Sequence, residues 1–171
     1  MGTPREVARG DEGYPERLES LARPPRHVYL EGPWTHDGPF VAIVGSRHAD
    51  GDGLDIARSL AAELAREGAA VISGLALGID AAAHEGALDA GGKSGAVLGT
   101  PLDRVHPRRH ATLQRRLAAS LGILSELAPG TAATKGTFVS RNRLVAALAD
   151  VVIVVQGRAK SGALLTADFA L

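Results

Sequence analysis

The chain has 171 residues, of which 45% are hydrophobic, enough for one substantial core but not for two. It has no cysteine, which excludes disulfides and thiolate metal sites, and its formal net charge of zero argues against a surface coated with nucleic-acid-binding charge. No apolar run approaches the ~20 residues of a membrane-spanning helix, and the N-terminus lacks an apolar signal segment. We therefore expect a cytoplasmic protein with no membrane partner, no metal site and no cofactor.

The first part of the chain, residues 1–37, is rich in proline and glycine. It holds one amphipathic fragment, from Tyr14 to Leu21, and one strand candidate, from Val28 to Leu30, which is closed by Gly32. So few periodic residues favour an N-terminal extension that packs on a main domain at 38–171 rather than a unit that folds alone.

From Phe40 onward, short apolar runs alternate with amphipathic segments. Strands that are apolar on both faces and alternate with helices are typical of a parallel sheet covered on both sides. The fold class predicted is therefore α/β, a doubly wound, mostly parallel sheet with helices on both faces. The expected strands are 41–44, 70–72, 96–98, 123–124 and 151–155, and the expected helices are 54–67, 81–90, 109–121, 136–148 and 161–171.

Right-handed crossovers place all strand-to-helix loops of such a sheet along one edge. The five loops at this edge contain most of the glycines and two clusters of basic residues. We therefore expect a local positive face within a neutral total charge. The first cluster comprises Arg104, Arg108, Arg109, Arg115 and Arg116 with His106 and His110, and the second comprises Lys135, Arg141, Arg143, Arg158 and Lys160.

Two of these loops have the composition of anion sites. In the stretch from Ser73 to His84, Gly74 and Gly78 punctuate a turn at the start of a helix, where free backbone amides bind phosphate. The run Gly45-Ser46-Arg47 directly follows a buried strand and is interpreted in the same way. The alternative for the second run is a simple turn with a solvated arginine.

Asp80 and His84 lie one turn apart on one face of the helix that follows. Asp80 either offsets the helix macrodipole or contacts a ligand, and both interpretations stay open. His84 is either a packing residue with a satisfied ring or a participant in chemistry. Both are treated as supporting candidates, together with Arg104 in the third loop.

The start of the helix at 136–148 combines positive charge with an aromatic ring. Lys135, Arg141 and Arg143 can neutralise phosphates, and Phe138 can stack on a base, which is the pattern of single-strand recognition. Asn142, between the two arginines, either caps or contacts a base or sugar. The alternative is that Phe138 packs in the core and the cations are surface residues.

Several motifs in chain order resemble the successive signatures of the DprA/Smf family, and together they cover residue 40 to the end. The segment with Tyr14-Pro15, Pro24-Pro25 and Gly32 also resembles the region that leads into the nucleotide-fold domain of that family. The motifs are Val41 to Arg47, Ser73 to His84, Gly99 to Pro107, Ser125-Glu126 with Pro129-Gly130-Thr131, Arg141-Asn142-Arg143, and Ser161-Gly162-Ala163-Leu164-Leu165-Thr166-Ala167.

This resemblance implies an extended Rossmann fold and a DNA-processing protein of natural transformation and recombination. Such proteins bind and protect incoming single-stranded DNA, help load the RecA recombinase, and work as homodimers without catalytic turnover. Arg47, Lys135 and Phe138 match the single-strand-binding pocket of the family, and Arg141 and Arg143 line the same edge. Ser161 and Gly162 in the last motif complete the set of predicted DNA-binding residues.

The sequence departs from the family pattern in its third loop, where Pro101 replaces a glycine and His106 a tyrosine. The chain also ends within the helix after the fifth strand, so we expect neither a final strand nor a winged-helix module. The alternative function is a nucleotide-ligand sensor or a LOG-like nucleoside monophosphate hydrolase of the same superfamily. The hydrolase loop Pro-Gly-Gly-x-Gly-Thr-x-x-Glu is missing from the sequence. Glu126 and Asp80 could in principle form an acid/base pair, but no nucleophile is placed beside them.

Overall fold

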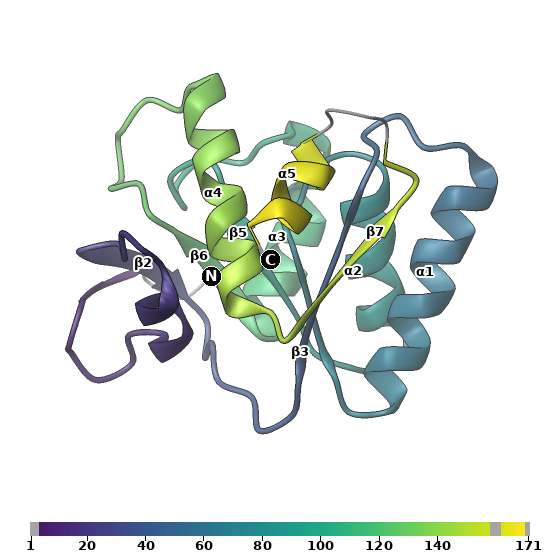
Figure 1. Ribbon diagram of the computed structural model, residues 1–171, viewed down its shortest axis with the longest axis horizontal. Coiled ribbons are helices and arrows are strands. Elements are labelled where there is room, and N and C mark those ends of the chain that lie inside the picture. The colour runs from purple at the N-terminus through teal and green to yellow at the C-terminus, as the bar shows by residue number, and fades with distance from the viewer. Residues whose placement is uncertain (1–3, 158–161, 170–171) are drawn as a thin grey trace.

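A computed structural model describes residues 4–157 and 162–169. The predicted site residue Ser161 and the basic residues Arg158 and Lys160 lie outside the described residues. Seven strands form one mixed sheet in the order β1-β2-β6-β5-β4-β3-β7 (Figure 1). The strands are β1 (Arg5–Ala8), β2 (His27–Glu31), β3 (Phe40–Gly45), β4 (Ala70–Ser73), β5 (Ser94–Leu98), β6 (Gly122–Ser125) and β7 (Val151–Val155).

The five strands from β3 to β7 are parallel and are the ones that the apolar runs predict. Each is followed by a helical segment. The α/β class with a mostly parallel sheet is therefore confirmed. The helices are α1 (Gly51–Arg66), α2 (Ile79–Asp89), α3 (Ala111–Ala119), preceded by the 3₁₀ turn η2 (Arg108–His110), α4 (Lys135–Leu148) and α5 (Gly162–Asp168).

The sheet is doubly wound around β3. From β3 the chain steps through β4, β5 and β6 in one direction, with α1, α2 and α3 on one face, and then returns to place β7 on the other side of β3. The helices α4 and α5 consequently cover the opposite face (Figure 1). In open α/β sheets a crevice forms at the carboxyl ends of the strands where the order reverses. Here that point lies at the end of β3.

Alternation along β3 fixes the two sides of the core. Val41 and Ile43 pack with the alanines of α1 and α2, whereas Ala42 and Val44 pack toward Leu144 of α4. β3 is thus buried on both faces and is paired on both sides, with β4 and with β7. None of the helices in the described ranges has both the length and the hydropathy that a membrane crossing requires.

The first part of the chain adds two strands to the same sheet. β2 pairs antiparallel with β6, and β1 pairs antiparallel with β2. The expected strand at 28–30 is thus present and one residue longer at each end, while β1 was not expected, because only Val7 of its four residues is buried. The amphipathic fragment forms a single 3₁₀ turn, η1 (Glu16–Ser20), which buries Leu18 against α4.

Candidate functional site

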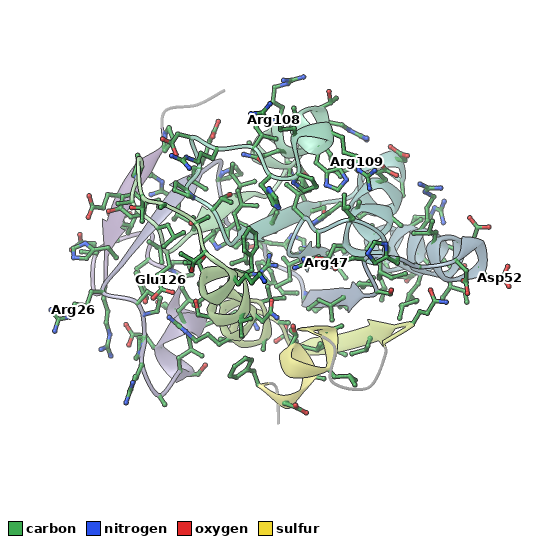
Figure 2. All side chains as sticks on the ribbon, turned by 90° about the horizontal axis from the view of Figure 1, so that it is seen from above. Arg26, Arg47, Asp52, Arg108, Arg109 and Glu126 are labelled. Atoms are coloured by element: carbon green, nitrogen blue, oxygen red, sulfur yellow. The ribbon has the colours of Figure 1, made fainter. Side chains whose placement is uncertain are left out.

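A pocket of about 440 Å³ opens at the carboxyl ends of β3 and β4, between these strands and the helices α4 and α5. Figure 2 looks down on this edge of the sheet and shows Arg47 near its centre. The sequence-predicted residues that line the pocket come from the ends of β3 and β4 with their loops and from the helices α2, α4 and α5. They are Gly45, Ser46, Arg47, Gly74, Asp80, Lys135, Phe138, Arg141, Asn142 and Gly162.

Close backbone packing brings the first two loops together. Gly78 has φ 77°, and a Cβ there would collide with the Ser46 carbonyl oxygen and lie 3.1 Å from the Cα of Arg47. The Ile79 amide donates to the same Ser46 carbonyl at 3.2 Å. Gly78 therefore lies behind the pocket and does not line it; it allows the turn that presents Arg47 to approach the start of α2.

Asp80 organises the loop between β4 and α2. Its Oδ2 accepts hydrogen bonds from the amides of Gly74 at 3.1 Å and Ala76 at 3.2 Å. Leu75, between them, is fully buried with φ 58°, a strained conformation for a leucine. Gly74 was predicted as a phosphate-binding residue, but its amide is already occupied by a buried carboxylate of this chain.

Arg141 lies at the floor of the pocket and is 6% exposed. Its Nη1 donates to the Val97 carbonyl and its Nε to Asn142 Oδ1 at 3.2 Å, and its guanidinium covers Gly74 so closely that a Cβ there would collide with it. Burial lowers the pKa of Arg141 and raises that of Asp80, and each charge partly offsets the shift of the other. The two residues thus form a buried ionic floor rather than a pair of exposed contacts.

Asn142 is also held by the protein itself. Besides accepting from Arg141, it donates from Nδ2 to the Gly162 carbonyl at 3.0 Å, which links α4 to α5. Its amide group is thereby committed at both ends.

Lys135 and Phe138 are positioned by the start of α4. Thr134 and Thr137 form a capping box, and the Thr137 hydroxyl also donates to the Gly99 carbonyl at 2.8 Å. Lys135, the first residue of the helix, is exposed. Phe138 is half-buried over Gly99, with its ring centroid 5.2 Å from that of His106. Phe138 is therefore not a core residue, and part of its ring faces the pocket.

Arg143 lies away from this group. Its Nη2 donates to both carboxylate oxygens of Glu126, at 2.6 and 2.7 Å, and Figure 2 shows Glu126 on the opposite side of α4 from Arg47. This corrects the expectation that Arg141 and Arg143 line one edge. Glu126 and Asp80 are both bound within the chain, Glu126 to Arg143 and Asp80 to the amides of Gly74 and Ala76.

Ser73 and His84 are fully buried and support the sheet. The Ser73 hydroxyl donates to the Ile43 carbonyl at 2.6 Å. Ser94 donates to the Val71 carbonyl, so His84 must be the donor in its 2.8 Å bond from Nδ1 to Ser94 Oγ. Burial lowers the pKa of His84 to about 3, which keeps the ring neutral. His84 is thus a packing residue with one satisfied nitrogen, and Arg104 lies exposed in the third loop.

The apolar part of the pocket was missed by sequence reasoning. Val139, Val145, Ala163 and Thr166 line it together with Val44 and Ala76. A signal existed on α4, because Phe138, Asn142 and Val145 recur at intervals of four and three residues and therefore share a face.

Comparison with known proteins gives the chain a family. The sequence profile of the DNA recombination-mediator protein A family matches residues 5–171. The chain belongs to this family. It is 38% identical to the protein Smf of Synechocystis over 98% of this chain and 43% of that protein, and 36% identical to the DNA processing protein DprA of Bacillus subtilis over 92% and 54%. The chain thus spans about half the length of these relatives of the recombination-mediator family.

Solved structures of the family confirm the Rossmann-like fold. The DNA processing protein A of Streptococcus pneumoniae superposes with a TM-score of 0.90 and 35% identity, over 97% of this chain and 59% of that one. That of Helicobacter pylori, described for its single-stranded DNA binding mode, superposes with a TM-score of 0.88 and 34% identity, over 98% and 75%. A molybdenum cofactor binding protein of Rippkaea orientalis, with a TM-score of 0.56, 22% identity and coverage of 80% and 72%, shares the fold alone.

Proposed function

We propose that this chain binds single-stranded DNA in the pocket at the carboxyl ends of β3 and β4. The observation that carries the proposal is the convergence of Arg47, Lys135 and Phe138 on one pocket from distant parts of the sequence. In the described parts of the chain, neither cation forms an ion pair with a carboxylate. Two free cations beside a half-buried ring match what the backbone and bases of an unpaired strand require.

Each residue has a distinct task in this proposal. The planar guanidinium of Arg47 grips a phosphate through two donors, and the ammonium of Lys135 adds a flexible point charge. Phe138 offers a stacking surface to one base. Arg141 contributes positive potential from the floor of the pocket, where its Nη1 and Nε already bind groups of this chain. Contacts of this kind read no base edges, so sequence preference is slight.

The wider role follows from family membership and is part of the same proposal. The chain acts in DNA processing during natural transformation and recombination, where it protects incoming single strands, assists loading of RecA and works as a homodimer without catalytic turnover. Support comes from the named relatives and from the Helicobacter pylori protein, whose single-stranded DNA binding is described.

A binding titration with single-stranded, duplex and mononucleotide ligands at two salt concentrations tests the proposal. We expect the single strand to bind tightest. Arg47→Ala and Lys135→Ala should each flatten the plot of log K against log salt by about 0.7, because each removes one phosphate contact. Phe138→Ala should weaken binding by roughly 1–3 kcal/mol with the slope nearly intact.

Arg115→Ala is the matched control, because it removes an equal charge from the exposed face of α3, outside the pocket lining. Its slope and affinity should stay close to those of the unaltered chain. Equal affinity for duplex, binding of mononucleotides alone, or an unchanged slope in both pocket variants would each contradict the proposal. Circular dichroism of the Phe138→Ala variant separates lost stacking from lost folding.

A further inference from the structure

The loop between β5 and α3 presents exposed arginines on the same edge as the pocket. Arg104, Arg108 and Arg109 are all exposed, and they flank His106 in the sequence. Figure 2 shows Arg108 and Arg109 at the rim of the face whose centre holds Arg47. Residues 104–109 are called the arginine loop below. None of its arginines lines the pocket.

The arginine loop touches the pocket through an aromatic contact. His106 packs on Phe138 with ring centroids 5.2 Å apart and an interplanar angle of 52°. Residues that precede His106 in this loop also bind the segment that leads into α4. The Thr137 hydroxyl donates to the Gly99 carbonyl, and the Gly130 amide donates to the Asp103 carboxylate at 3.2 Å. His106, which does not line the pocket, therefore places a second, exposed ring beside that of Phe138.

The other end of the loop is connected to the second pocket loop. His110, directly after Arg109, donates from Nδ1 to the Leu75 carbonyl at 3.1 Å. Leu75 belongs to the strained turn that Asp80 holds, and Gly78 of the same turn packs on Arg47. The arginine loop is thus fastened at both ends to elements that form the pocket wall.

The charges of this loop are not neutralised locally. Its three arginines form no ion pair with any carboxylate in the described ranges, whereas two arginines of the surrounding helices are paired. Arg58 pairs with Glu85 and Arg116 with Asp89, each at 2.6 Å. The one acidic residue between 99 and 110 is Asp103, and its carboxylate accepts a backbone amide. An unbalanced cluster of this kind attracts an extended anion.

We propose that the arginine loop is a second binding segment for the phosphates of nucleotides that leave the pocket. The strand would pass from Lys135 and Phe138 across His106 and reach Arg108 and Arg109, whose forked guanidinium groups suit phosphate. The ligand is the same sequence-independent backbone of an unpaired strand. This inference rests on the proposed function, because it extends the path of a strand held in the pocket.

Oligothymidines of two lengths test the inference, one of about 5 nucleotides that fills the pocket alone and one of about 20 that reaches beyond it. At about 0.15 M salt, where exposed charges are screened beyond about 8 Å, the double variant Arg108→Ala/Arg109→Ala should bind the long strand about tenfold or more weakly. Its salt slope for that strand should fall by about 1.4, the effect of two lost phosphate contacts. Affinity for the short strand should change by less than about twofold.

The control is Arg115→Ala/Arg116→Ala, which removes the same charge from the same region, where Arg115 binds Thr112 and Arg116 binds Asp89. It should leave both lengths unaffected. An equal loss for short and long strands, or an equal loss in the control, would overturn the inference, as would no loss at either length. If the unaltered chain binds neither oligonucleotide, the proposed function itself is wrong. If binding depends on Arg47 and Lys135 but not on Arg108 and Arg109, only the proposal of a second binding segment is wrong.

Discussion

Asp80 and Arg141 illustrate how burial changes the task of a charged residue. Both lie beside the pocket, yet Asp80 is occupied by two amides and Arg141 by a carbonyl and an amide oxygen. A buried charge must be compensated by hydrogen bonds or by an opposite charge, and here all these partners belong to this chain. Asp80 and Arg141 therefore contribute to binding through the shape of the pocket and through its electrostatic potential. Residue types alone could not separate them from Arg47, which is exposed.

His84 gives a pH-dependent prediction at the scale of one residue. Its pKa is lowered to about 3 by burial, and the charges of His110 and Arg141 act in the same direction. The unfolded chain takes up a proton below about pH 6.5, whereas the folded chain does not, so stability is full above that pH and is lost as the pH falls toward 3. The loss should approach about 1.4 kcal/mol per pH unit.

Comparison with His84→Asn, measured by urea unfolding at about pH 7 and about pH 5, isolates this contribution. Asparagine keeps an N–H donor near Nδ1 but does not titrate. The stability advantage of the unaltered chain should be largest at pH 7 and smaller at pH 5. Asp80, whose raised pKa acts in the opposite sense, is present in both proteins and cancels. A difference in the free energy of unfolding between the two proteins that stays constant with pH would show that the buried ring does not control the pH dependence of stability.

At the scale of elements, the rotation of α4 decides which of its basic residues serve the pocket. Successive residues on a helix are about 100° apart, so Phe138, Asn142 and Val145 face the pocket while Arg143 points to Glu126. The sequence predicted all five parallel strands and the helices between them, because their apolar periodicity is strong. It could not predict the angle at which α4 packs, since that depends on the shapes of η1, β3 and β5, which the helix contacts.

Gly45 tests whether the end of β3 is as tightly fixed as the pocket requires. A Cβ on this residue would collide with the Val155 carbonyl of the neighbouring strand and lie 2.6 Å from Ile79 Cγ1. The backbones of the paired strands β3 and β7 cannot move apart without a cost in free energy, so Gly45→Ala should lower the free energy of unfolding by about 1–3 kcal/mol or more. Gly51→Ala, at the first position of α1 with no atom within 4 Å, should be neutral or slightly stabilising. Equal effects of both substitutions in urea unfolding would contradict this packing.

For the whole molecule, the notable feature is how residues 4–37 join the rest. Pairing of β2 with β6 connects segments far apart in the chain, and no local sequence pattern predicts which strand β2 pairs with. Arg17 strengthens the junction by binding Asp150 at 2.6 Å, while Asp150 also accepts from the Phe40 amide at 2.8 Å. The expectation of an extension packed on a main domain therefore leaves open whether the two parts unfold together.

The single tryptophan makes that question measurable. Trp34 is 8% exposed, its amide donates to Leu121 at 2.6 Å, and its ring packs over Gly95 and Gly122, so its fluorescence reports the junction. Far-UV circular dichroism reports mainly the helices that cover the sheet. Because the strands form one continuous sheet, both probes should give coincident urea transitions.

The variant Leu18→Ala sharpens the test, since this fully buried side chain joins η1 to α4. Loss of its packing should destabilise the whole chain by about 2–5 kcal/mol and move both transitions equally. Glu16→Ala, on the exposed side of the same turn, should move neither by more than about 0.5 kcal/mol. A fluorescence transition that precedes the dichroism transition, or that alone responds to Leu18→Ala, would mean that residues 1–37 melt from an intact main domain. In that case the pocket, which lies wholly within the later part of the chain, should still bind its ligand after the first transition.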